Sequence, residues 1–139
     1  MSRADENVET ARRALAAFSA GDFEASLATM DPEIEWHLFF RLPDLPLRSV
    51  YRGRDEVRAI WNVLAAAWES FGIEIEEILH ADDEVIVLRG RFRGRGAESG
   101  VEVDRVVYYH LRLADGLLTY IRGFDDEAAA RRDAGLDRD

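Results

Sequence analysis

Arg105 stands where the sequence predicts the inward face of a strand. Between Val101 and Leu113, large apolar residues recur at every second position, and Arg105 shares their parity. Because a buried guanidinium is costly without an anion, this side chain is expected to pair either with a protein carboxylate or with an acidic group on a ligand. The sequence leaves both alternatives open.

Three tryptophans supply large flat surfaces that suit the wall of an apolar pocket. Trp36 falls on a predicted strand, whereas Trp61 and Trp68 share one face of a predicted helix. Each ring also carries one N–H group that needs a polar partner when it is buried. We interpret all three as pocket residues, with plain core packing as the alternative for the helical pair.

The three histidines, His37, His80 and His110, all fall on the polar parity of their predicted strands. None lies at i, i+4 spacing from another metal-ligating residue type, so we expect no bound metal and no other cofactor. His37 follows Trp36 at the start of an irregular segment, where a bulge would turn it inward as a general base. The alternative is a histidine at the surface or at an interface.

Four arginines alternate along one predicted strand and place a row of positive charge on one of its faces. These residues are Arg89, Arg91, Arg93 and Arg95. Such a row either binds an anion or is balanced by carboxylates on the neighbouring strands. The acidic character of the chain favours the second interpretation, with Glu74, Glu76, Glu102 and Asp104 as the expected partners.

Helical spacing of apolar residues predicts helices over residues 4–19, 23–30 and 127–134, and a long one that follows Gly53 and reaches Phe71. Period-two alternation predicts strands over residues 33–38, 73–81, 85–95, 101–113 and 117–124. The last four of these strands are joined by short turns and should form an antiparallel meander. Residues 39–52 contain two prolines without a clean period and are predicted to form a loop.

Length and composition indicate one α+β domain that spans residues 1–139. The sequence has no apolar run of about 18 residues and no secretory signal, so we expect a cytoplasmic protein without a membrane partner. Acidic residues number 28 against 18 basic ones, which gives a formal charge of −10. A field of this sign repels phosphate backbones, and we expect no nucleic-acid partner.

Several short segments, taken in order, resemble the SnoaL-like polyketide cyclase branch of the nuclear transport factor 2-like superfamily. They are FSAGD at 18–22, DPEIEW at 31–36, YRGRDEV at 51–57, Asp115-Gly116 before a strand, and the residues around 127–136. The resemblance implies a cone-shaped α+β fold, with three to four helices packed on a curved antiparallel sheet around an internal apolar pocket. The pocket is expected to be lined by Trp36, His37, Tyr51, Trp61, Leu64, Trp68 and Val107.

The resemblance also implies acid–base chemistry on a small, carbonyl-bearing molecule of polyketide-like or terpenoid-like type. SnoaL-like cyclases use an aspartate near the end of the last strand, and Asp125 or Asp126 is the nearest match. In this hypothesis Asp125 is the general base, and Tyr109 and Arg105 polarise the developing enolate oxygen. The alternatives are an epoxide hydrolase-like enzyme and a non-catalytic module in which Arg105 binds a ligand carboxylate.

A homodimer through the outer sheet face is the expected assembly. Val106, Tyr108 and His110 have the parity opposite to Arg105 and Tyr109. If the helices cover only one face of the sheet, these side chains would stand in water, and a second copy would shelter them.

Overall fold

A computed structural model describes residues 2–39 and 47–136 of the chain. Its helices are α1 (Arg3–Ser19), α2 (Phe23–Leu27), α3 (Arg54–Ala67) and α4 (Glu127–Asp133). Its strands are β1 (Met30–His37), β2 (Val50–Arg52), β3 (Trp68–Ala81), β4 (Val85–Gly96), β5 (Glu102–Ala114) and β6 (Leu117–Phe124).

Capping residues fix the ends of the first two helices. The Ser2 hydroxyl accepts a hydrogen bond from the Asp5 backbone N–H, and the Asp5 carboxylate accepts one from the Ser2 N–H, which forms a capping box. Gly21 ends α1 with a φ of 79°, a conformation that favours glycine, and Asp22 then caps α2. None of the described helices is both long enough and apolar enough to cross a membrane.

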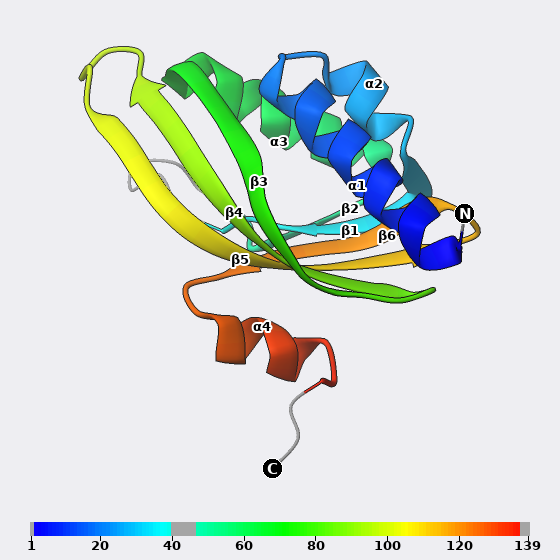
Figure 1. Ribbon diagram of the computed structural model, residues 1–139. Coiled ribbons are helices and arrows are strands. Elements are labelled where there is room, and N and C mark those ends of the chain that lie inside the picture. The colour runs from blue at the N-terminus through cyan, green and yellow to red at the C-terminus, as the bar shows by residue number, and fades with distance from the viewer. Residues whose placement is uncertain (1, 40–46, 137–139) are drawn as a thin grey trace.

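The six strands form one curved sheet in the order β2-β1-β6-β5-β4-β3. The β1–β6 pair is parallel, and the other neighbouring strands are antiparallel. Helices α1, α2 and α3 lie over one face, whereas α4 lies beneath the opposite face (Figure 1). The α+β class, the curved sheet and the antiparallel meander from β3 to β6 are therefore confirmed.

The predicted long helix is wrong at its C-terminal end, because α3 stops at Ala67 and Trp68 begins β3. Trp68 has extended backbone angles, and Phe71 pairs with Gly94 of β4. A β-carbon on Gly94 would lie 2.9 Å from the Trp68 ring, so glycine leaves the space that this ring occupies. The apolar spacing suited either element, and the pairing with β4 determines which one forms.

The predicted loop over residues 39–52 contains a short strand that the sequence did not reveal. In β2, Tyr51 pairs with Trp36 of β1 and extends the sheet by one strand. Residues 40–46 of the predicted loop lie outside the described residues. The second helix is shorter than predicted, because it ends at Leu27 and Met30 already belongs to β1.

Both faces of the sheet are covered, so the expectation that helices shelter only one face is wrong. The main core lies between the inner face and α1 to α3. A smaller apolar cluster lies under α4, where Ala130 and Ala134 pack with Val85 and Val87 of β4. His110, expected on the outer surface, is only 1% exposed in the same region.

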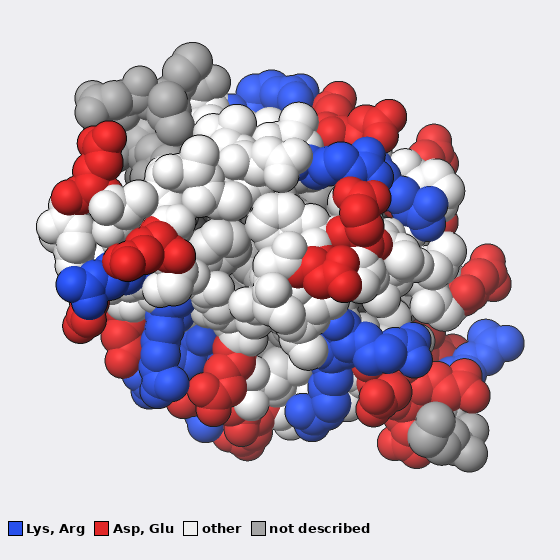
Figure 2. All heavy atoms as spheres, turned by 90° about the horizontal axis from the view of Figure 1, so that it is seen from above, with Lys and Arg blue, Asp and Glu red and all other residues white. Residues whose placement is uncertain are grey.

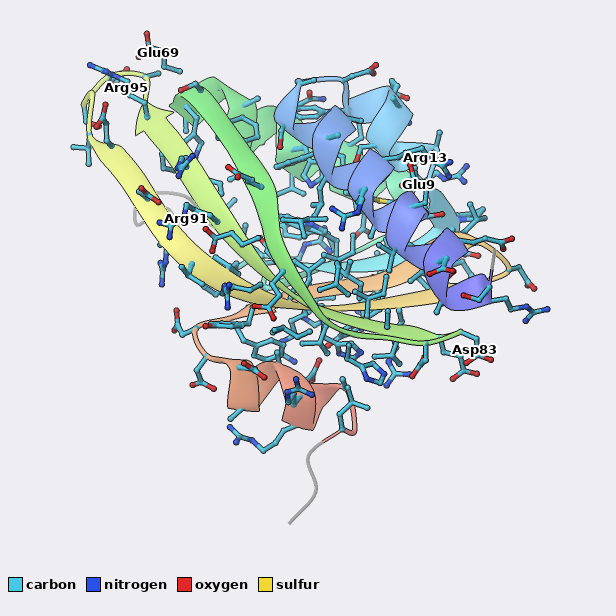
Figure 3. The ribbon with its side chains drawn as sticks, viewed as in Figure 1. Glu9, Arg13, Glu69, Asp83, Arg91 and Arg95 are labelled. Carbon is cyan, nitrogen blue, oxygen red and sulfur yellow. The ribbon has the colours of Figure 1, made fainter. Side chains whose placement is uncertain are left out.

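The four alternating arginines of β4 pair with carboxylates, as the balanced interpretation predicts. Arg91 contacts Glu76 at 2.9 Å and Asp104 at 2.8 Å. The same row ends at Arg95, which contacts Glu69 at 3.2 Å (Figure 3). All four expected partners, Glu74, Glu76, Glu102 and Asp104, take part in these cross-strand ion pairs.

Candidate ligand-binding site

A partly enclosed space, here called the inner cavity, lies between the helices and the inner face of the sheet. Its volume is about 60 Å³, and most of its wall is apolar. The aromatic part of the wall consists of Phe18, Trp36, Phe39, Trp61, Trp68, Phe71, Phe92 and Tyr109. A cavity of about 150 Å³ can hold benzene, so a ring of that size would enter here only if side chains moved.

Trp61 is the centre of the aromatic packing. Its ring makes edge contacts with Phe18 at 4.9 Å, Phe23 at 5.3 Å and Trp36 at 6.2 Å between centroids. These perpendicular arrangements place ring edges against ring faces, which is the favourable geometry for aromatic pairs. The packing holds Trp61 in one orientation, with 2% of its surface exposed.

Two of the polar side-chain atoms in this largely apolar wall lack a hydrogen-bond partner among the described residues. One is Nε1 of Trp61, which is fully buried. The other is the hydroxyl of Tyr109, a residue that is 8% exposed. Burial raises the pKa of Tyr109, and the nearby Arg105 charge opposes this only in part, so the hydroxyl stays protonated and can donate a hydrogen bond.

Ser26 is another polar residue of the wall, but its donor is already in use. Its hydroxyl donates a 2.8 Å hydrogen bond to the Ala14 carbonyl of α1. No arginine, aspartate or glutamate lines the inner cavity among residues 2–39 and 47–136. Among the described lining residues, therefore, no carboxylate is present that could act as a general acid or base inside the cavity.

Arg105 and Asp125 lie outside the inner cavity and pair with each other. The distance from Arg105 Nη2 to Asp125 Oδ1 is 2.7 Å, and the two side chains are 43% and 75% exposed. The expectation that Arg105 is buried in the interior is wrong, because its side chain is 43% exposed and the guanidinium keeps part of its hydration while it pairs with Asp125. The alternative in which Arg105 pairs with a protein carboxylate is confirmed.

Phe39 separates this ion pair from Tyr109. The Arg105 guanidinium stacks 4.8 Å from the centre of the Phe39 ring, and Phe39 also lines the inner cavity. On the other side, a β-carbon on Gly123 would lie 3.2 Å from both the Phe39 and the Tyr109 rings. The two rings therefore pack side by side over Gly123, with the ion pair beyond Phe39.

A second hollow, here called the polar groove, lies where β1 and β6 end and α4 begins. Its volume is about 410 Å³, and its lining includes Asp125, Asp126 and Arg122. Asp126 accepts a 2.7 Å hydrogen bond from the Ala129 N–H and so caps α4. Neither aspartate lines the inner cavity, and Phe39 borders both spaces.

His37 also borders both spaces, but its ring is engaged elsewhere. Its Nε2 donates to Glu35 at 2.6 Å, since a carboxylate only accepts. The ring lies 5.1 Å from Tyr120, whose hydroxyl contacts α4 on the outer face of the sheet. A role as an inward-facing base is not supported by this orientation.

The other predicted pocket residues divide into two groups. Leu64 lines the inner cavity together with the three tryptophans, as predicted. Tyr51 and Val107 are buried behind the wall: Tyr51 lies 6.2 Å from Trp36, and Val107 packs against Gly123. Period-two alternation places a residue on the inner face, but it does not show whether that residue reaches the cavity.

A polar cluster under α4 was not found from the sequence. Asp133 accepts hydrogen bonds from Tyr120 at 2.6 Å and from His110 Nδ1 at 2.8 Å, and Arg122 approaches it at 3.5 Å. Burial lowers the pKa of His110, although the bond to Asp133 opposes this effect. Among the described residues, no group of three or more His, Asp or Glu side chains is arranged to hold a metal ion.

From the helical side, charged side chains surround a central area of uncharged ones (Figure 2). A curved sheet with helices over one face and an enclosed apolar cavity is the architecture of the nuclear transport factor 2-like proteins. The SnoaL-like domain profile matches residues 11–121, and the chain belongs to this family.

Other proteins resemble this chain in sequence or in fold. The uncharacterized protein Rv0034 of Mycobacterium tuberculosis is 28% identical over 128 residues, which cover 91% of this chain and 93% of that protein. An NTF2-like protein of unknown function from Burkholderia pseudomallei K96243 has a TM-score of 0.76 and 22% identity, over 91% of this chain and 95% of that one. TerC co-crystallized with polyporic acid has a TM-score of 0.76 and 17% identity, over 91% of this chain and 96% of the TerC chain.

Proposed function

We propose that the chain binds a small, apolar, carbonyl-bearing molecule in the inner cavity, with the Tyr109 hydroxyl donating a hydrogen bond to the carbonyl oxygen. The observation that carries this proposal is a buried phenol without a described partner in an otherwise apolar wall. Buried hydroxyl groups normally have a hydrogen-bond partner, and a ligand oxygen would supply it. TerC, which has the same fold, was co-crystallized with the small molecule polyporic acid.

Binding requires the cavity to widen, because about 60 Å³ is too small for a fused-ring molecule. Phe39 is the residue whose displacement would widen it most directly. This ring closes the wall between the inner cavity and the polar groove, and it lies at the end of β1 rather than within a paired strand. We therefore propose that a ligand enters past Phe39.

The three tryptophans make a direct test possible, because all of them line the inner cavity. In a ¹⁵N-labelled sample, three indole N–H cross-peaks should report on this space, and indane, a compact hydrocarbon, should shift them on binding. Ala14→Met would fill the wall of the cavity from α1 and weaken this response. Ala16→Met, on the exposed side of the same helix, is the matched control. If indane leaves all three cross-peaks in place at its solubility limit, the proposal is refuted.

Acid–base turnover is the second candidate function, and the position of Phe39 favours it. With Phe39 displaced, Tyr109 and the Arg105–Asp125 pair would face the same space. Asp125 would then remove a proton beside the carbonyl, while Tyr109 and Arg105 stabilise the enolate oxygen. Asp125→Asn and Arg105→Ala should each lower turnover of an identified substrate at least 100-fold. Wild-type turnover in both variants would end this mechanism.

We also propose that the chain forms a homodimer through the part of the outer sheet face that α4 leaves open. His110 is excluded from that interface by its burial, but Val106 and Tyr108 remain half-exposed. Light scattering at tens of micromolar should give the mass of a dimer. The double variant Val106→Glu with Tyr108→Glu should give the mass of a monomer.

A further inference from the structure

Two residues that line the inner cavity, Tyr109 and Trp68, lie far apart along β4. Tyr109 of β5 pairs with Leu88 of β4, whereas the ring of Trp68 lies against Gly94 of the same strand. Since a strand rises about 3.3 Å per residue, Leu88 and Gly94 are about 20 Å apart along it. The cavity therefore has a phenol hydroxyl toward one end of β4 and an indole ring toward the other.

The wall toward the indole end is apolar. The lining residues that α3, β3 and β4 contribute are Trp61, Leu64, Trp68, Phe71, Ile73 and Phe92. Apart from the indole N–H groups, these side chains carry no polar atom. A ligand whose carbonyl oxygen accepts a hydrogen bond from Tyr109 would therefore place an apolar portion along them.

Gly94 makes room for the Trp68 ring. A β-carbon on Gly94 would lie 2.9 Å from Cε3 and 3.0 Å from Cζ3 of that ring, and 3.1 Å from Cε1 of Phe92. Glycine inside a strand often marks the close approach of another group, and here the group is the Trp68 indole, which makes an edge contact with Phe92 at 5.6 Å between centroids. A side chain on Gly94 would push the indole away from the sheet and into the inner cavity.

The backbone on both sides of this ring is also tied to the end of β4. Trp68 pairs with Gly96, and the Ala67 carbonyl accepts a 3.1 Å hydrogen bond from the Ala97 N–H. Phe39, by contrast, lies beyond the last residue of β1. A ligand that displaces Phe39 on entry would thus meet a fixed ring at Trp68.

We propose that Trp68, seated on Gly94, is the end wall of the inner cavity and a specificity-determining residue that limits the length of the ligand. This inference rests on the proposed binding function and adds the class of ligand to it. The ligand is a carbonyl compound with its oxygen toward Tyr109 and an apolar chain or ring system of limited length that ends at Trp68.

A series of linear methyl ketones from 2-pentanone to 2-undecanone tests the inference, because only the length of the alkyl chain changes. Titrations followed by the indole N–H cross-peaks give the affinity of each ketone. In the wild-type protein, the affinity should rise by up to about 4-fold per methylene and then level off at the ketone whose alkyl chain reaches Trp68. The shift of the Trp68 cross-peak, assigned by its loss in Trp68→Leu, should grow with the alkyl chain and level off at the same ketone.

Two substitutions should move this limit in opposite directions. Trp68→Leu should extend it by about two methylenes, because the lost ring area exceeds that of several methylenes. Gly94→Ala should shorten it, since the new β-carbon displaces the indole into the cavity. Gly90→Ala is the matched control on β4, because its β-carbon would meet Ile73 at 3.3 Å and no aromatic ring, and it should leave the limit unchanged.

The possible failures can be told apart. If no ketone moves any indole cross-peak, the proposed binding function is refuted, and the inference with it. If the ketones bind but the limit stays at the wild-type length in Trp68→Leu or in Gly94→Ala, the cavity binds ligands and the inference is overturned. A limit that moves as far in Gly90→Ala as in Gly94→Ala overturns it as well. If Trp68→Leu does not fold, Gly94→Ala and the wild-type indole shifts decide the question, with the cross-peak then assigned in Trp68→Phe.

Discussion

Replacing Asp133 by alanine should loosen the attachment of α4 to the outer face of the sheet. The Asp133 carboxylate accepts a 2.6 Å hydrogen bond from Tyr120 and a 2.8 Å hydrogen bond from His110 Nδ1. His110 is 1% exposed, and its Nε2 atom has no hydrogen-bond partner among the described residues. Without the carboxylate, the imidazole would therefore keep no described partner at either nitrogen.

The expected loss in the free energy of unfolding is about 3 kcal/mol. Two hydrogen bonds to a charged group contribute roughly 1.5 to 3 kcal/mol each, and water can replace part of this because the Asp133 side chain is 22% exposed. The loss also cannot exceed the free energy that docks α4, because a larger perturbation would simply release the helix. The apolar part of that docking is small, since the buried residues of this segment are Ala130 and Ala134.

Urea denaturation followed by circular dichroism measures this loss, and the melting temperature should fall by about 10 °C for a domain of this size. A lower m-value in the variant would indicate that α4 is released while the rest stays folded. Glu127→Ala is the control on the same helix, because it removes only the exposed ion pair with Arg131 and should cost less than about 0.5 kcal/mol. An Asp133→Ala protein as stable as the Glu127→Ala control would refute this account of how α4 is held.

Stability should also fall as the pH drops below about 6.5, because burial lowers the pKa of His110 in the folded state and the unfolded chain takes up the proton first. Urea midpoints that stay constant from pH 7 to pH 5 would contradict this expectation for His110. Burial opposes ionisation of Asp133, but its hydrogen bonds outweigh that effect and lower its pKa. A second loss of stability is therefore expected below about pH 4. Gly123→Ala should lower the free energy of unfolding by about 1 to 3 kcal/mol and move the Tyr109 ring, since the new β-carbon would lie 3.2 Å from that ring. An unchanged melting temperature would contradict this, because it would show that the neighbouring side chains accommodate the methyl group without cost. Arg91→Ala should cost less than about 1 kcal/mol, with the difference from wild type shrinking in 0.5 M salt, because its ion pairs are partly open to water.

The sequence predicted the sheet well because alternation of apolar residues is a local property. It failed at Trp68 and Phe71, where the apolar spacing fits a helix and a strand equally and the partner strand decides. The burial of His110 could not be read from its own strand, since the helix that covers it begins 17 residues later in the chain, at Glu127.

For the candidate site, the sequence identified the types of residue better than their positions. Trp36, Trp61 and Trp68 line the inner cavity as predicted, because large aromatic side chains on an inner face have few other places to pack. Arg105 has the predicted parity but its side chain is 43% exposed, and periodicity carries no information on how deeply a residue on that face is covered. The separation of Tyr109 from Asp125 depends on Phe39, which the sequence placed in a loop.

The parallel pairing of β1 with β6 has a consequence for how the chain reaches this structure during synthesis. Trp36 pairs with Ile121, so two walls of the inner cavity come from opposite ends of the sequence. On a ribosome, the segment that carries Trp36 must wait until about 85 further residues have been added before its neighbour exists. The antiparallel strands β3, β4 and β5 can pair through local contacts in the meantime, and contacts between distant segments form more slowly. Nascent chains should therefore expose the aromatic side chains around Trp36 until the segment that carries Ile121 has been synthesised, which is the interval in which a chaperone would bind them.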